Sequence, residues 1–145
     1  MGAYRFGKDA LLLYDAYASA GSQATTEMDN VRDLTLNLTS VEVDTTTRAS
    51  TLFKSSKVVF LDASLDFEML DEASDTALAA ISAAYMAMEP LPLFPVDVSA
   101  GEGLDADWNI TSFTRNEPLE GVVTYSVTAK INNESREPTW ATHSP

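Results

Sequence analysis

Apolar and polar residues alternate along much of the chain after residue 30, which is the pattern of β-strands with one buried face. Leu alternates with Thr and Asn over residues 34–38, and Val41 and Val43 continue the alternation on the opposite parity. A β-bulge or tight turn near residues 39–40 is expected to absorb the extra residue. The clearest strand covers residues 58–69, where one face carries Val59, Leu61, Ala63, Leu65, Phe67 and Met69.

Further strand signals differ in strength. Residues 104–110 and 123–131 alternate strongly, and Phe113 changes the parity after the first of these segments. Residues 10–14 form a short apolar run, which favours a strand because loop-forming residues follow it. Residues 91–98 contain prolines, which predicts an edge strand or an extended connection and not a central strand.

One helix is predicted at about residues 75–88. Asp71 or Ser74 can cap its N-terminus, and Pro90 stops it. Apolar residues recur at spacings of three and four and form one stripe, which consists of Leu78, Ile81, Tyr85 and Met88. Alanines fill much of the remaining helix surface, so the helix can lie close against a sheet.

These elements together predict a mainly β protein of the α+β class. We expect an antiparallel β-sandwich or barrel of about six strands, with one flanking α-helix at about 75–88 and a long extended loop at about 44–57. A chain of 145 residues has the size of one ordinary domain, so residues 1–145 are predicted to form a single domain. Residues 1–8 and 132–145 are expected to be flexible arms.

Composition excludes several classes of protein. The chain has 22 acidic and 9 basic residues, a formal net charge of −13, which argues against a nucleic-acid reader because phosphate binding needs a basic face. It has no cysteine, which excludes disulfides, thiol catalysis and sulfur-ligated metals. No apolar run approaches the roughly 20 residues that span a bilayer, so no membrane anchor is expected.

No residue pattern supports catalysis or a cofactor. The single histidine, His143, lies near the C-terminus in a segment expected to be solvated. Residues 105–109 imitate the start of a calcium loop, but the glycine and glutamate that such a loop needs are missing. Asp62, Asp66 and Glu68 lie at alternate positions of one strand, with no feature that would keep one of them protonated for glycoside hydrolysis. We therefore expect no enzyme, no metal and no cofactor.

Charge is distributed unevenly along the chain. Between Val58 and Thr114 there are eleven acidic residues and no basic residue, whereas between Thr45 and Leu61 there are three basic residues and no acidic residue. Charge runs of this kind can simply be solvated faces. Alternatively, a basic loop of one copy is attracted to the acidic body of the next, a head-to-tail contact that builds rings or filaments.

The order of these features resembles the tail tube proteins, or major tail proteins, of long-tailed bacteriophages. A strand leads into an acidic and then Thr/Ser/Arg-rich stretch at residues 41–50, and the long strand at 58–69 and the helix at 75–88 follow. The segment 104–121 looks most like the family, with a strand that ends in Thr-Ser-Phe, then Pro-Leu-Glu-Gly, before the final strand. The resemblance covers about residues 31–131.

The resemblance implies a structural virion protein that self-assembles into hexameric rings, which stack into the hollow tail tube through which DNA is delivered. It implies that the loop after Val41 reaches the adjacent ring, and this role is carried over to Thr45, Thr46, Thr47, Arg48, Lys54 and Lys57. It also implies an acidic lumen. Strand parity offers as lumen-facing residues Asp62, Asp66, Glu68, Asp105 and Asp107.

The implied partners are further copies of the chain, other tail proteins such as the tail tip and terminator, and DNA that passes through the lumen without specific binding. The implied location is the virion tail, preceded by the host cytoplasm before assembly. Two other interpretations fit the same residues. One is the tube protein of a contractile injection or secretion system, and the other is a monomeric β-sandwich carbohydrate-binding module, which exposed aromatic residues beside a groove would favour.

Overall fold

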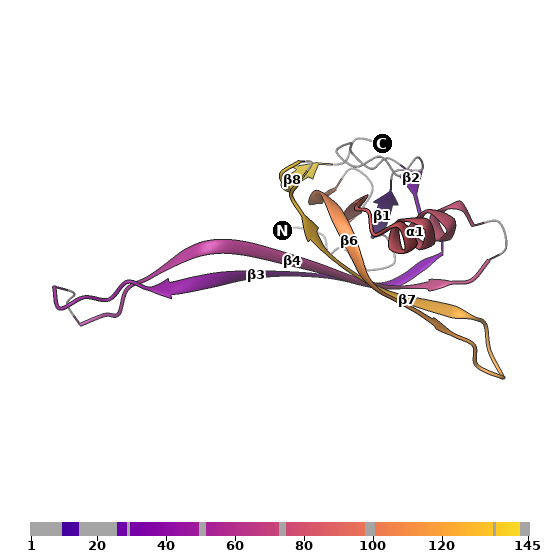
Figure 1. The fold of residues 1–145 in the computed structure, drawn as a ribbon, viewed down its shortest axis with the longest axis horizontal. Coiled ribbons are helices and arrows are strands. Elements are labelled where there is room, and N and C mark those ends of the chain that lie inside the picture. The colour runs from indigo at the N-terminus through magenta and orange to yellow at the C-terminus, as the bar shows by residue number, and fades with distance from the viewer. Residues whose placement is uncertain are drawn as a thin grey trace, which may run out of the picture.

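The computed structural model describes residues 10–14, 26–28, 30–49, 52–72, 75–97, 101–134 and 136–142. These residues form one helix and one antiparallel sheet of eight strands, in the order β2-β1-β5-β6-β7-β4-β3 with β8 paired to β6 (Figure 1). The strands are β1 (Leu11–Tyr14), β2 (Thr26–Glu27), β3 (Val31–Asp44), β4 (Ser56–Leu70), β5 (Leu91–Val96), β6 (Glu102–Asn116), β7 (Thr124–Asn132) and β8 (Thr139–Thr142). The predicted mainly β, α+β class is confirmed.

The sheet curls so that strands from both of its ends face one hydrophobic core. Leu12 of β1 and Leu93 of β5 belong to the same buried cluster as Leu65 of β4 and Val127 of β7. Trp108 of β6 is fully buried in this cluster, and its indole N–H donates a hydrogen bond of 3.1 Å to the Leu93 carbonyl. This arrangement is sandwich-like, as the alternation of residues predicts.

The β3–β4 hairpin extends far beyond the rest of the sheet, and the shorter β6–β7 hairpin projects toward the opposite side of the molecule (Figure 1). The strands of the long hairpin continue to Asp44 and resume at Ser56. The loop predicted at about 44–57 therefore corresponds to residues 45–55, which connect the two strands at the outer end of the ladder.

Two irregularities interrupt the β3–β4 ladder. The register shifts between Val41 and Glu42, one to two residues after the bulge predicted at 39–40. A second shift lies between Arg32 and Thr35, where Asp33 has a left-handed backbone with φ of 52°. The change of parity along this strand thus has the predicted cause at a slightly different position.

β5 lies between β1 and β6, so the prediction of an edge strand or a connection for residues 91–98 is wrong. Pairing between β5 and β6 is interrupted between Leu93 and Val96, and Pro95 lies in this interruption, while on its other side it lies opposite Leu12 of β1. Gly103 of β6 faces the same place, and a Cβ there would lie 1.6 Å from the Pro95 carbonyl oxygen. The close approach of the two backbones requires glycine.

The helix α1 (Thr76–Ala87) lies within one residue of the predicted bounds at each end. Asp75 is the N-cap, and its carboxylate accepts a hydrogen bond of 3.0 Å from the backbone N–H of Ala77. The prediction of Asp71 as the cap is therefore wrong, and Ser74 lies outside the described residues. Met88 ends the helix in a left-handed conformation with φ of 57°, two residues before Pro90.

The face that α1 buries is narrower than the predicted stripe. Ala77, Ile81 and Ala84 are buried, whereas Tyr85 and Met88 are 37% and 90% exposed. The small alanine side chains let the helix backbone approach the sheet, as the composition of the segment predicts. The outer part of the predicted stripe remains on the surface.

We expect Asp75→Ala to lower the free energy of unfolding by about 1 kcal/mol, because it removes the N-cap hydrogen bond. The same carboxylate also accepts a hydrogen bond of 3.1 Å from the Asn30 side-chain amide. Asp75→Asn keeps a capping oxygen and is expected to retain most of the stability. Urea denaturation of both variants measures the difference, and an equal loss in the two would contradict a capping role.

The segment before the C-terminus is more regular than predicted. β8 pairs with β6 from Thr139 opposite Asp105 to Thr142 opposite Glu102, so the expectation of a flexible arm over 132–145 is wrong for these residues. A strand of four residues is too short to show a clear alternation in the sequence. Residues 1–8 and 143–145, with His143, lie outside the described residues.

Candidate functional site

The outer part of the β3–β4 hairpin, residues 38–61 and here called the arm, exposes much apolar surface. It carries nine of the fifteen large hydrophobic side chains that are exposed in the described part of the chain. Val59 and Leu61, which the sequence places on the core face of a strand, are 44% and 82% exposed because they lie beyond Ser64, where the pairing of β4 with β7 ends. A concentration of exposed apolar side chains on one projecting element is typical of a protein–protein contact.

Hydroxyl side chains close the end of the arm. The Thr45 backbone N–H donates to the Ser55 carbonyl at 2.9 Å, and the Thr45 and Ser55 hydroxyls are 2.9 Å apart. The Thr46 hydroxyl accepts from the Ser55 N–H at 2.8 Å and donates to its carbonyl at 3.1 Å. The Thr-rich stretch at 45–47 therefore holds the two strands together where regular pairing ends.

Asp44 begins this closure with a turn in which its carboxylate accepts a hydrogen bond of 2.8 Å from the Thr46 N–H. Hydrogen bonds from the Thr46 side chain and backbone lower the pKa of the Asp44 carboxyl. A lowered pKa means that the turn is stabilised above the ordinary Asp pKa and loses this contribution as the pH falls through the lowered value.

We expect Thr46→Val to raise the pKa of Asp44 toward the ordinary Asp range, because it removes the side-chain hydrogen bond and leaves the backbone N–H in place. The measurement is a carboxyl carbon NMR titration of the two proteins. Thr45→Val is the matched control, since it removes a neighbouring hydroxyl whose hydrogen bond of 2.9 Å is made with Ser55. An unchanged Asp44 titration in Thr46→Val would contradict the role of the hydroxyl.

The end of the arm is also basic. Arg48, Lys54 and Lys57 are exposed, and Lys57 lies opposite Val43 in the ladder. The structure thus brings together at one end of the molecule the residues that the sequence assigns to an inter-ring loop, namely Thr45, Thr46, Thr47, Arg48, Lys54 and Lys57. The end of the arm thus exposes both apolar and cationic side chains, which suits it to contact an acidic surface of another chain.

An acidic face follows the arm along β4. Asp62 is exposed, and Asp66 and Glu68 are half-buried on the side of the strand opposite the core residues. The Thr128 hydroxyl of β7 donates to Asp66 at 2.8 Å, and Lys130 of the same strand lies opposite Ser64. The three predicted carboxylates therefore share one face of the sheet.

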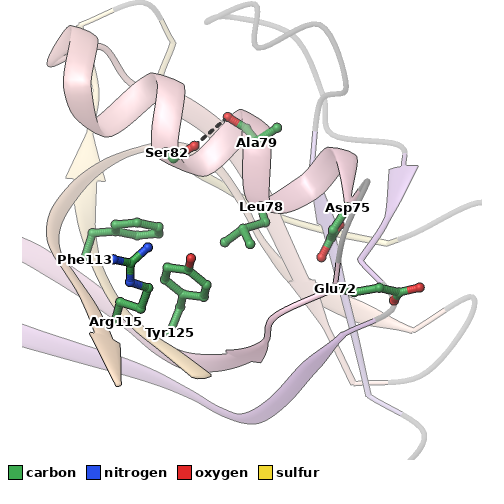
Figure 2. Close-up of a pocket in the computed structure, with 8 residues that line it drawn as sticks. All are labelled: Glu72, Asp75, Leu78, Ala79, Ser82, Phe113, Arg115 and Tyr125. Atoms are coloured by element: carbon green, nitrogen blue, oxygen red, sulfur yellow. Dashed lines mark hydrogen bonds between the residues drawn. The ribbon is translucent and has the colours of Figure 1, made fainter. Parts of the chain in front are cut away.

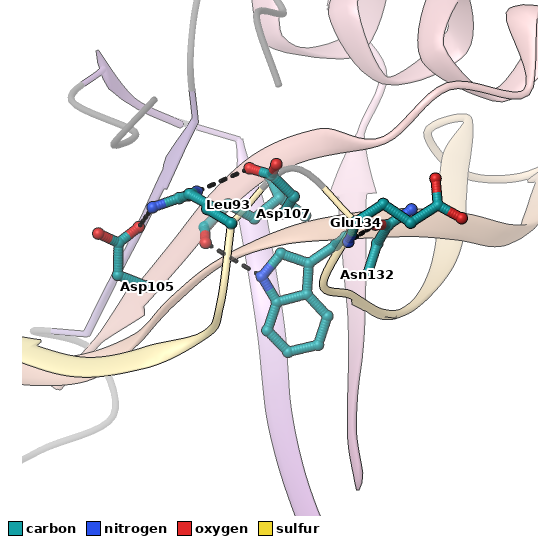
Figure 3. Close-up of polar contacts among 7 residues, drawn as sticks. Leu93, Asp105, Asp107, Asn132 and Glu134 are labelled. Atoms are coloured by element: carbon teal, nitrogen blue, oxygen red, sulfur yellow. Dashed lines mark hydrogen bonds and ion pairs between the residues drawn. The ribbon is translucent and has the colours of Figure 1, made fainter. Parts of the chain in front are cut away.

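Asp105 and Asp107 do not belong to this face, and the prediction that they line a lumen is wrong for the chain as folded. They are 5% and 0% exposed on β6 (Figure 3), and their odd-numbered positions place them on the side of the strand opposite Trp108. Arg136 lies over them, with Nη1 2.9 Å from Asp105 Oδ1 and Nε 2.9 Å from Asp107 Oδ1. A carboxylate that is buried and paired in this way cannot present its charge to a bore.

The ion pairs define the charge state of Arg136. Burial disfavours the charged guanidinium, but the contacts with Asp107 and Asp105 outweigh it and raise the pKa of Arg136. The guanidinium therefore remains charged at any pH at which the chain folds. Its role is to attach the segment before β8 to β6.

Sequence reasoning missed Arg136. It lies in a polar segment in which Pro138 and Pro145 follow it, a composition that indicates a loose end. The sequence offers one signal for it, namely that Asp105 and Asp107 alternate with the apolar residues of the strand at 104–108 and could therefore need a cationic partner. Strand parity places such acids on one face but does not say whether another segment covers that face.

A cleft of about 650 Å³ lies between α1 and the β6–β7 hairpin (Figure 2). Phe113 stacks between Tyr85 and Tyr125, at ring-centroid distances of 6.0 and 5.0 Å. Arg115 forms an ion pair of 3.2 Å with Glu117, and the Asn30 amide binds the Glu72 carboxylate at 2.8 Å. These partners give the polar groups of the cleft structural roles.

No group of three or more His, Cys, Asp or Glu side chains in the described residues could hold a metal ion. None of the helices in that part of the chain is long and apolar enough to cross a membrane.

The exposed apolar and basic arm and the acidic face of β4 suit this sheet to contacts with other protein chains. The family model for phage tail tube proteins matches residues 5–135. The chain therefore belongs to the phage tail tube protein family, and it has a structural role in a virion tail tube. No curated protein sequence matches it.

Solved structures share the fold at low sequence identity. The virion of a native gene transfer agent particle contains a chain with 16% identity and a TM-score of 0.76, over 95% of this chain and 99% of that one. The tail of an empty gene transfer agent particle, with C6 symmetry, contains one with 16% identity, a TM-score of 0.77 and the same coverage. The SPP1 tail tube gives 15% identity and a TM-score of 0.75, over 98% of this chain and 81% of that one.

Proposed function

We propose that this protein forms hexameric rings that stack into the hollow tube of a phage tail. The observation that carries the proposal is the arm, which exposes nine large hydrophobic side chains on the isolated chain and needs neighbours to cover them. Membership of the tail tube family and the C6 symmetry of the similar gene transfer agent tail support a ring of six.

In this proposal the end of the arm, residues 45–57, crosses to the adjacent ring. Its position far from the body supports a contact between rings, since it projects along one direction of the molecule (Figure 1). The basic residues at the end would meet the acidic body of the neighbour, which also fixes the direction of stacking.

Asp62, Asp66 and Glu68 are proposed to face the lumen. Charges are screened beyond about 8 Å at physiological salt, but carboxylates on the wall of a narrow bore repel phosphate at contact distance. DNA would therefore pass without adhering. Repulsion of this kind needs no specific recognition of the nucleic acid.

In the same proposal, the subunit is in the host cytoplasm before assembly and in the virion afterwards. Tail tip and terminator proteins bind it at the two ends of the tube. It has no enzymatic activity and needs no cofactor.

The test of the assembly is size-exclusion chromatography with light scattering over a concentration series, with negative-stain images of the same fractions. We expect rings or hollow rods whose proportion rises with concentration. A monomer that stays single at all concentrations and also when seeded with tail tips would overturn the proposal.

Reversing two lumen charges, Asp66→Lys with Glu68→Lys, is expected to leave tubes intact and to lower DNA delivery at least tenfold, because cations on the wall bind phosphate. Glu89→Lys with Glu120→Lys makes the same change in net charge at two exposed positions outside β4 and is the matched control. Particles complemented with each variant are compared for intact tubes and for DNA delivery. Normal delivery by the first variant would show that these carboxylates do not line the bore.

A further inference from the structure

A groove of about 520 Å³ lies where the arm joins the body, between the inner end of the arm and the segment that leads into β8. Its lining is largely aliphatic and aromatic, with apolar side chains from Leu38, Leu61, Leu104, Ile131, Pro138 and Trp140.

The apolar rim of this groove is open to solvent. Leu38, Leu61 and Trp140 are 56%, 82% and 57% exposed. Trp140 is held in place, because its indole N–H donates to the Glu102 carboxylate at 3.1 Å and its strand pairs with β6. The groove is thus formed before anything binds to it, which favours affinity because little ordering remains.

The end of the arm carries side chains of the matching kind. Leu52 and Phe53 are 96% and 82% exposed and project from the segment that connects β3 and β4. Arg48, Lys54 and Lys57 surround them in the sequence. An occupant with two apolar anchors and flanking cations is therefore available on every copy of the chain.

Charge distinguishes the groove from the cleft beside α1. The charged residues that line the groove are both acidic, Asp62 and Glu137. The cleft beside α1 is lined by Arg115 as well as by Glu72 and Asp75, and both of these carboxylates already bind the Asn30 amide. The basic end of an arm is therefore better matched by the groove, whose charged groups are all acidic.

The arm cannot fill the groove of its own chain. Leu38 lines the groove, and the paired ladder continues from there to Asp44. Six residues of extended strand span roughly 20 Å, so the end of the arm is held at least that far away while the hairpin remains paired. The occupant must come from another copy.

We propose that the groove at the base of the arm is the receptor for the end of the arm of a second copy, with Leu52 and Phe53 in the apolar part and Lys54 beside Glu137. The inference rests on the proposed tube and names the surface on which the arm of the neighbouring ring is seated. The end of each arm then binds at the base of the arm of the next subunit, so the arms form continuous rows along the tube axis.

The absence of cysteine from the chain allows a direct test by disulfide cross-linking. Leu52→Cys is combined with Asn133→Cys, an exposed position on the groove, so that Phe53 and Trp140 are unchanged. Oxidation of assembled tubes is expected to give a ladder of cross-linked chains on a non-reducing gel. Mixing the two single variants should give dimers and nothing larger.

Two matched pairs test other seats for the arm. Leu52→Cys with Met88→Cys places the second thiol at the end of α1, and Leu52→Cys with Leu119→Cys places it at the end of the β6–β7 hairpin; both positions are at least 90% exposed. Tubes that cross-link through either of these pairs and not through Asn133→Cys would overturn the groove and leave the tube standing. Absence of any assembly in the unchanged chain would overturn the tube and the groove together.

Phe53→Ser provides a second measurement without cysteines. It is expected to raise the protein concentration needed for tubes at least tenfold, whereas Phe53→Leu keeps an apolar anchor and should stay within threefold of the unchanged chain. Because Phe53 is exposed on the monomer, both variants should unfold at the same urea concentration as the parent. Equal assembly of the two variants would overturn the role of the apolar anchor.

Discussion

Replacing three apolar side chains of the arm by threonine is expected to prevent tube formation at concentrations where the unchanged chain assembles. The variant combines Val41→Thr, Val58→Thr and Phe60→Thr, all at positions 50% or more exposed. Fully burying one such side chain stabilises by about 1.5–3 kcal/mol, and about half of that remains available here, or roughly 3 kcal/mol for three positions. This corresponds to about a hundredfold rise in the critical concentration for assembly.

The fold of the monomer should not change, because threonine keeps a high strand propensity and surface substitutions usually stay within about 0.5 kcal/mol each. Circular dichroism and urea denaturation check this, and light scattering with electron microscopy measures assembly. The control variant, Ser40→Thr with Glu42→Gln, changes polar positions on both sides of Val41 in β3 and should assemble normally. Assembly of the triple variant at the parent concentration would show that the arm surface is not an interface.

The course of the strands could be predicted from the sequence because alternation reports which side of a strand is covered. The buried set on β4 and the change of parity at Phe113, where the ladder shifts between Ile110 and Ser112, both follow the pattern. The same rule fails for Val59 and Leu61, since an alternating strand can be built to meet another chain as well as its own core. Alternation identifies an apolar face and does not identify the molecule that covers it.

Two other errors have local physical causes. Proline argues against a central strand because it lacks an N–H, but the ladder beside Pro95 is interrupted, and Gly103 allows the backbones to approach there. The cap of α1 is ambiguous in the sequence because several acids and serines precede the helix, and the backbone geometry of Asp75 decides it. Such choices depend on backbone paths that a residue pattern does not contain.

Some features of the candidate site could be predicted from the sequence and others could not. The basic end of the arm and the acidic face of β4 could be predicted, because exposed charge runs are visible in the sequence as runs. The groove could not, since it forms where Leu38, Leu104 and Trp140, far apart in the chain, come together. Nor could the burial of Asp107, which depends on Arg136, 29 residues away.

Removing the guanidinium above the two buried aspartates is expected to cause the largest loss of stability among single substitutions of charged residues in the described part of the chain. Arg136→Met leaves Asp105 and Asp107 buried without their cation, and breaking a buried pair costs about 3–5 kcal/mol. Because the Arg136 side chain is 17% exposed, we expect a value near the lower end, about 3 kcal/mol. Urea denaturation at pH 7 measures it.

The matched control adds Asp105→Asn and Asp107→Asn to Arg136→Met, which removes the buried charge and should recover most of the stability at pH 7. A deficit that persists in the triple variant would show that lost packing of the Arg136 side chain, and not uncompensated charge, is responsible.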